Sequence, residues 1–188
     1  MGGKAMSDPY NRPILTDGRV TVRPPKSTDV HARLALGVSP EILRMYGTIL
    51  PKKGVSYNEK AARAWVERQM NDPLGFCIDK DGALVGALRI HSLDEQDARA
   101  SIGIGLLDDT RLSQGIGTAA LRLILKHAFT TMGLHRISLR ALEYNARAIA
   151  AYRKVGFVEE GLLRESCKVG DEWHNDVMMG LLAQEFIG

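Results

Sequence analysis

Short runs in which hydrophobic and polar residues alternate predict β-strands in several parts of the chain. The runs 76–79 and 84–90 flank Lys80-Asp81-Gly82, and an Asp-Gly pair between two such runs is typical of a tight hairpin turn. Similar patterns predict strands over 20–23 and 137–141. A helical period takes over in four other segments, which begin near capping residues. These are 28–38 (closed by Pro40), 60–70 (after a capping box that starts at Ser56), the segment from Thr118 onward, and 145–156.

The run 101–106 alternates most regularly of all. Ile102, Ile104 and Leu106 share one face, whereas Gly103 and Gly105 leave the other face nearly bare. A bare strand face indicates that another backbone or a ligand lies close against it.

The order of these elements predicts an α/β (α+β) architecture. Strand–helix–strand–helix is framed by hairpins at both ends, and the second hairpin joins 157–168 to 173–182. This order favours a mixed sheet with helices packed on it. Repeats and linkers are absent from the sequence, so we expect one domain over 14–188, preceded by a disordered leader over 1–13.

The composition excludes several classes of protein but does not identify one. The 188 residues are 45% hydrophobic and 25% charged, with a net charge of +3, which is ordinary for a soluble domain and gives no sign of a nucleic-acid partner. Apolar runs stay far below the roughly 20 residues that span a bilayer, so we expect no membrane partner. Cys77 and Cys167 fit no metal or redox spacing, which predicts a reducing cytoplasm and no metal site.

The segment 106–118 carries the most specific chemistry. An apolar strand leads through a polar loop to Gly115 and Gly117 at the start of a helix, where free N–H groups and the helix dipole favour a phosphate. A Walker A loop is excluded because Gly-Lys-Ser/Thr does not follow. The stretch 115–120 does satisfy the dinucleotide pattern G-x-G-x-x-A, with Glu143 as the acidic partner. Against that alternative, the polar residues 108–114 separate the glycines from their strand, and too few strands follow.

A second segment settles which phosphate ligand to expect. Residues 145–157 follow the pattern N-x-x-A-x-x-x-Y-x-K-x-G-F, and the stretches 160–165 and 170–174 continue it. With 114–118, these make the chain from Ala98 to Leu182 similar to the GCN5-related N-acetyltransferase (GNAT) family, in its RimJ/RimL-like branch. The resemblance implies a mostly antiparallel sheet with two splayed central parallel strands and helices on both faces.

The resemblance also implies acetyl-CoA as co-substrate. Its pantetheine arm would lie along Leu106 and Leu107, and its pyrophosphate on the loop that opens the helix. The implied cofactor-binding residues are Leu106, Leu107, Leu112, Ser113, Gln114, Gly115, Ile116, Gly117, Thr118, Asn145, Ala148, Tyr152 and Lys154.

For catalysis the resemblance implies Tyr152 as the general acid that protonates the departing thiolate. A phenol suits this role because its ordinary pKa of about 10 keeps it protonated near neutrality. The general base stays open, because Ser101 stands where related sequences carry Glu. Glu143, a loop carboxylate such as Asp97, or a chain of waters could serve, or a base could be unnecessary for an amine of low pKa.

The implied reaction is direct transfer of acetyl to a primary amine: a protein N-terminus, a polyamine, an amino acid or an antibiotic. We expect the acceptor pocket between 36–57 and the last hairpin, which also offers a surface for a homodimer. Because Ser101 replaces Glu, a non-catalytic CoA-binding or interaction module on the same fold is the alternative.

Overall fold

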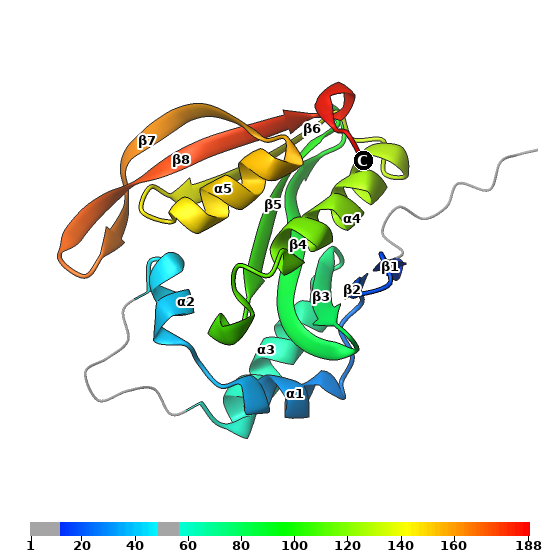
Figure 1. Cartoon of the computed structure of the whole chain (residues 1–188), viewed down its shortest axis with the longest axis vertical. Helices are drawn as coiled ribbons and strands as arrows, with labels where there is room; N and C mark the ends of the chain where they lie inside the picture. Colours follow the sequence, from blue (N-terminus) through cyan, green and yellow to red (C-terminus); the bar gives the residue numbers. More distant parts are fainter. Residues whose placement is uncertain (1–11, 49–56) are drawn as a thin grey trace, which may run out of the picture.

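The structure, a computed structural model, describes residues 12–48 and 57–188, and its eight strands form one sheet (Figure 1). The strand order is β1-β2-β3-β4-β5-β6-β8-β7, and every neighbouring pair is antiparallel except β5 with β6. The mixed, mostly antiparallel sheet predicted from the sequence is therefore confirmed. The strands are β1 Leu15–Thr16, β2 Val20–Arg23, β3 Gly75–Lys80, β4 Ala83–Asp94, β5 Arg99–Leu106, β6 Arg136–Leu142, β7 Val158–Val169 and β8 Glu172–Leu182.

Helices cover both faces of this sheet and bury two separate apolar clusters. The main core packs α4 and α5 against the sheet, through residues such as Phe76, Leu88 and Ile124. On the opposite face, α1 and α3 share a small cluster of their own: Val30, Ala62 and Val66. The helices are α1 Asp29–Leu36, α2 Pro40–Met45, α3 Glu59–Asn71, α4 Ile116–Thr130 and α5 Ala146–Val155, with 3₁₀ turns at Asp109–Arg111 and Ala183–Glu185.

The two parallel strands separate almost as soon as they meet. β5 and β6 pair only over three residues, from Arg99↔Arg136 to Ser101↔Ser138. Beyond Ser101, β5 stays bonded to β4 on its outer edge, and β6 stays bonded to β8. The inner edges of both strands therefore lie open. The predicted splay of two central strands is present.

Two N-terminal predictions need correction. Pro40 does not close the first helix, which ends at Leu36; it begins α2, where the Ser39 hydroxyl accepts a hydrogen bond from the Ile42 N–H. Proline suits this first helical position because its missing N–H would have no partner there. The start of α3 is capped by the Asn58 side chain, which accepts from the Ala61 N–H. Ser56, the predicted capping residue, lies outside the described residues.

The predicted leader over 1–13 also falls mostly outside the described residues, but Arg12 does not. Its Nη1 donates to the carbonyl oxygens of Gln69, Asp72 and Gly75, at 3.2, 3.0 and 3.3 Å. The guanidinium thus donates to carbonyl groups at and just beyond the end of α3, where carbonyls run out of helical partners. Arg12 belongs to the folded unit.

A buried ionic cluster fixes the N-terminal strands to α1. Arg23 on β2 binds Asp29 at 2.8 Å and Asp79 at 2.5 Å, and all three residues are buried. Burial alone would raise the pKa of Asp29, but hydrogen bonds from Arg23 and from the Lys26 N–H lower it below the ordinary value. Asp29 is therefore ionised at neutral pH, and the ion pairs of Arg23 with Asp29 and Asp79 hold β2, β3 and α1 together.

We expect Arg23→Met to destabilise the fold by about 3–5 kcal/mol at pH 7, because it leaves two buried carboxylates without their cation. The lowered pKa of Asp29 means that its contribution is present above the ordinary value of 3.8 and is lost as the pH falls through the folded-state value. The difference from the wild type should accordingly shrink below about pH 4. Urea unfolding across this range measures both effects. Arg19→Met, in the exposed β1–β2 turn, is the control, and an equal loss there would contradict the assignment.

Candidate active site

A cavity of about 1240 Å³ opens where β5 and β6 part. It is lined by both strands, by the start of α4 and one face of α5, and by α1, α2 and α3 on the other side of the sheet. Segments 36–48 and the last hairpin, expected to form the acceptor pocket, line the same cavity through residues such as Met45, Cys167 and Met178. The remainder of the predicted segment, 49–56, lies outside the described residues.

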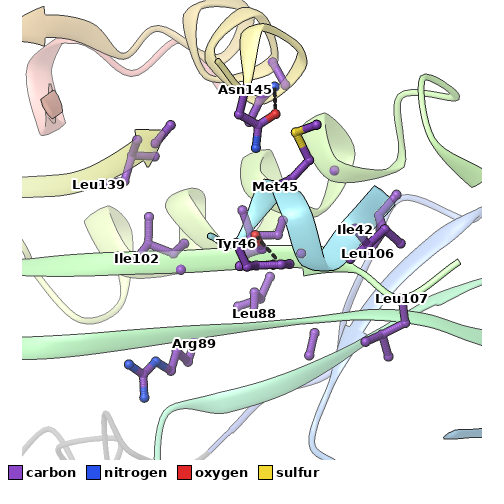
Figure 2. A pocket seen from close by; sticks show the side chains of 18 of the residues that line it. Ile42, Met45, Tyr46, Leu88, Arg89, Ile102, Leu106, Leu107, Leu139 and Asn145 are labelled. Carbon is purple, nitrogen blue, oxygen red and sulfur yellow. Dashed lines mark hydrogen bonds between the residues drawn. The ribbon is translucent and has the colours of Figure 1, made fainter. Parts of the chain in front are cut away.

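The open edge of β5 presents unused backbone groups to this cavity. The Leu107 N–H donates to the Val85 carbonyl at 2.9 Å, so the backbone of Leu107 faces β4. Because backbone groups of successive residues point to opposite edges of a strand, those of Ile102, Ile104 and Leu106 face the gap. Of the two residues predicted to hold the pantetheine arm, Leu106 offers its backbone to the gap, and Leu107 contributes its side chain to the cavity lining (Figure 2).

The start of α4 forms a cradle suited to an anion. Ser113 and Gly115 both have positive φ, of 60° and 77°, and this geometry turns the backbone sharply into the helix. α2, α3 and α5 each have a side chain that caps the N-terminus, whereas α4 has neither a side-chain cap nor an acidic residue in its first turn. The first N–H groups of α4 are thus available for a phosphate.

Most of the predicted cofactor residues line the cavity around this cradle. Leu112, Ser113 and 115–118 are in its wall, as are Asn145, Ala148, Tyr152 and Lys154 on the α5 side. Gln114 is not in the wall, because its side-chain amide turns back to donate to the Thr110 carbonyl at 2.9 Å. Asn145 caps α5 through the Ala148 N–H at 3.2 Å, and Figure 2 shows its side chain at the cavity.

Tyr152 lies deep in the cavity wall. The residue is only 8% exposed and packs edge-on against Phe157, with ring centroids 6.0 Å apart. Its hydroxyl makes no hydrogen bond within 12–48 or 57–188. Burial, together with the nearby Tyr46, raises the pKa of Tyr152 above the ordinary value. The phenol is therefore protonated at any physiological pH and available as a donor.

Tyr46 occupies the bare strand face predicted at Gly105. The Tyr46 hydroxyl donates to the Ile104 carbonyl at 3.2 Å (Figure 2). A Cβ built on Gly105 would lie only 1.1 Å from the Tyr46 hydroxyl oxygen. Although the residue is 55% exposed to the cavity, its hydroxyl lies deep between the strands, and burial raises the pKa of Tyr46 to about 12. The space left by Gly105 is thus filled by an aromatic ring from α2, which the sequence pattern did not indicate.

The point where the strands part carries a hydroxyl pair and a histidine. Ser101 and Ser138 lie opposite each other, with Oγ atoms 3.0 Å apart. His91 pairs with Ser101 across β4 and β5 and lines the cavity on the same face. Its Nδ1 lies 3.1 Å from the Ser92 hydroxyl, and its Nε2 faces the space beside Gly103. Burial and the cations of Arg89 and Arg140 lower the pKa of His91, against a smaller opposing effect of Asp72.

The carboxylates named from the sequence lie elsewhere. Glu143 is exposed, and its two oxygens accept from the backbone and side-chain N–H groups of Asn175, at 3.0 and 2.8 Å. Asp97 pairs with Arg99 at 3.2 Å on the surface. Neither residue lines the cavity. The carboxylate that does line it, Asp176, is buried and engaged by Arg140 and Ser166, at 2.9 and 3.0 Å.

The splayed sheet, the open strand edge and the uncapped helix start together suit the extended arm and the phosphates of an acyl-CoA. The Acetyltransferase (GNAT) domain family matches residues 19–158, so the chain belongs to the GNAT family and is an N-acetyltransferase. YdaF of Bacillus subtilis (strain 168), named as a candidate ribosomal N-acetyltransferase, is 31% identical over 73% of this chain and 75% of its own.

Two further comparisons bear on the site. RimJ of Mycobacterium smegmatis in complex with CoA-disulfide superposes with a TM-score of 0.74 and 26% identity, over 93% of this chain and 88% of its own. The spermidine N(1)-acetyltransferase of Escherichia coli (strain K12) is 25% identical over 60% of both chains. The RimJ structure agrees with the RimJ/RimL-like branch, and its bound CoA-disulfide agrees with acetyl-CoA as co-substrate. Among the described residues, every helix is too short or too polar to cross a membrane.

We expect Gly105→Ala to destabilise the wild type but to be nearly neutral when Tyr46 is also changed to Ala. The added methyl group competes with the Tyr46 hydroxyl for one space, and residues in contact commonly show interaction energies of about 0.5–3 kcal/mol. Urea unfolding of the wild type, Gly105→Ala, Tyr46→Ala and the double variant gives the interaction energy between the two positions. Gly103→Ala is the matched control, since its Cβ would meet only His91 Nε2, at 4.0 Å. Equal effects of Gly105→Ala in both backgrounds would show that the ring does not hold this position.

Proposed function

We propose that this enzyme transfers acetyl from acetyl-CoA directly to a primary amine, without an acyl-enzyme intermediate. The gap between β5 and β6 carries this proposal, because it joins an open strand edge to a free helix start. The backbone groups of Ile102, Ile104 and Leu106 suit the amides of the pantetheine arm, and 112–118 suits the pyrophosphate. Bound there, acetyl-CoA supplies an activated acetyl thioester.

Tyr152 acts as the general acid in this proposal. Its hydroxyl is protonated, faces the cavity and makes no competing hydrogen bond within the described residues, so it can donate to the sulfur as the thiolate departs. Tyr46 lies nearby with a protonated hydroxyl of its own, but that hydroxyl is already bonded to the Ile104 carbonyl.

His91 acts as the general base. Its lowered pKa keeps the imidazole neutral at pH 7, and its place beside Ser101 puts it where the related sequences have Glu. The hydroxyls of Ser101 and Ser138, 3.0 Å apart, position a water or the amine between His91 and the strand opening. Glu143 keeps a structural role in this scheme, because both of its oxygens hold Asn175 of β8.

The proposal also covers the acceptor, the oligomeric state and the location of the enzyme. The acceptor could be a ribosomal component, as the name of YdaF suggests, or a polyamine, as the name of the spermidine acetyltransferase states. The edge strand β7 exposes Val158, Leu162 and Leu163, which supports the predicted homodimer. The free thiols of Cys77 and Cys167 support a cytoplasmic location.

Tyr152→Phe should lower kcat about 100-fold and leave acetyl-CoA affinity within about threefold, because only the proton donor is removed. Initial rates and isothermal titration measure the two quantities. Tyr144→Phe is the control, since the Tyr144 hydroxyl donates to the Arg44 carbonyl away from the cavity wall. An unchanged kcat in Tyr152→Phe would remove this tyrosine from the chemistry.

His91→Gln should lower kcat/KM about 100-fold at neutral pH. It should also remove the fall in kcat/KM that the wild type shows at acidic pH. In the wild type, kcat/KM should fall as the pH drops through the pKa of His91, which lies below the ordinary 6.5. His135→Gln, a change at an exposed histidine, should keep the wild-type profile. An acidic limb that survives in His91→Gln would assign the base to another group.

A further inference from the structure

The cavity wall carries a large excess of positive charge. Among the described residues, six arginines and one lysine line it, against one carboxylate, that of Asp176, which is already bound by Arg140 and Ser166. Arg111 and Arg147 are paired with Asp108 and Glu41, which lie outside the wall. The cations in the wall are Arg33, Arg68, Arg89, Arg111, Arg140, Arg147 and Lys154. A site with this lining favours ligands that bring negative charge.

The phosphates of acetyl-CoA account for only part of this charge. Arg111 and Lys154 lie on the same side as the start of α4, and Arg147 on α5 pairs with Glu41 at 2.9 Å. A second group comes from the other face of the sheet. Arg33 belongs to α1, Arg68 to α3, and Arg89 pairs with Gly103 on the bare face of β5. These three residues, Arg33, Arg68 and Arg89, are called the acceptor-side group below.

Arg33 is the buried member of the acceptor-side group and has no counterion among residues 12–48 and 57–188. The residue is 7% exposed, and its guanidinium stacks 4.1 Å from the Tyr57 ring centroid and 5.4 Å from that of Trp65. Nη1 donates to the Gly37 carbonyl at 2.6 Å, whereas Nε is buried without a partner. Burial and the charge of Arg68 lower the pKa of Arg33. A buried cation in this state is costly unless an anion completes it.

Arg68 and Arg89 extend the group toward the open strands. Both are exposed, and neither forms an ion pair within 12–48 or 57–188. Outside those ranges the sequence contains a single acidic residue, Asp8. Within the described residues, the chain therefore places three guanidinium groups on one side of the cavity without an ion pair to any of them.

We propose that the amine acceptor carries an oxyanion, a carboxylate or a phosphate, which Arg33, Arg68 and Arg89 bind while the amine points toward Ser101 and His91. Guanidinium groups suit this task because their paired N–H donors match the oxygens of either anion. A polyamine, which carries only positive charge, would be repelled from the same wall. This inference rests on the proposed acetyl transfer and narrows its acceptor.

Matched pairs of acceptors test the inference. β-Alanine and propylamine differ by a carboxylate in place of a methyl group, and O-phosphoethanolamine and ethanolamine differ by the phosphate. We expect kcat/KM to be about 10–100-fold higher for the anionic member, as one charged hydrogen-bonded contact provides. Spermidine should be the poorest acceptor. A preference confined to one pair would identify which oxyanion the site binds.

Arg68→Gln should raise KM for the anionic acceptors about tenfold and change KM for propylamine and acetyl-CoA by less than about twofold. Arg63→Gln is the matched control, because Arg63 is on the same helix but pairs with Glu59 away from the cavity. A merely structural role for Arg68 would affect all acceptors alike.

Calorimetric titration separates this inference from the proposed function. O-Phosphoethanolamine, added to protein already saturated with CoA, should bind the wild type and Arg63→Gln but bind Arg68→Gln about tenfold more weakly. If no amine is acetylated although this binding is seen, the proposed function fails and the anion site stands. Absence of that binding, or neutral amines that match their anionic partners as acceptors, would overturn the inference.

Discussion

The site depends on one limit in the sheet: β5 and β6 pair over only three residues. Each strand remains fully bonded to its outer neighbour, so the separation leaves polar backbone groups without partners along the inner edges. Such groups are costly when they are buried and unpaired. The Tyr46 hydroxyl satisfies one of them at Ile104. In the proposed complex, the amides of the pantetheine arm would pair with the others, so the unpaired edge serves as a binding site.

The parts of the site that were predictable from sequence are those determined locally. Gly115 and Asn145 act at helix starts through their own backbone or side chain, so their neighbours in sequence suffice to identify them. Ser39 and Pro40 also indicate the start of α2, but a helix beginning there was not predicted from them. His91 was different, because its place opposite Ser101 depends on strand register. Tyr46 reaches Gly105 from another element 59 positions earlier, and the sequence has no signal for that contact.

The sheet also divides the work of the enzyme between its two faces. The proposed proton donor and the phosphate cradle belong to α5 and α4, which are part of the main core. The arginines of the acceptor side belong largely to α1 and α3, across the sheet. The gap between β5 and β6 connects the two faces of the sheet. His91 and the Ser101–Ser138 pair lie at its narrow end. Cofactor binding and proton donation are thus proposed for one face of the sheet, and acceptor binding and the base for the other.

The small cluster of Val30, Ala62 and Val66 gives that division a consequence for how such enzymes diversify. Because α1 and α3 have an apolar contact of their own, side chains on their cavity-facing surfaces can change with little cost to the packing around α4 and α5. Mutations there would alter the acceptor without passing through an unstable intermediate sequence. A scaffold arranged in this way can acquire new acceptors through successive single substitutions while the acetyl-transfer machinery remains unchanged.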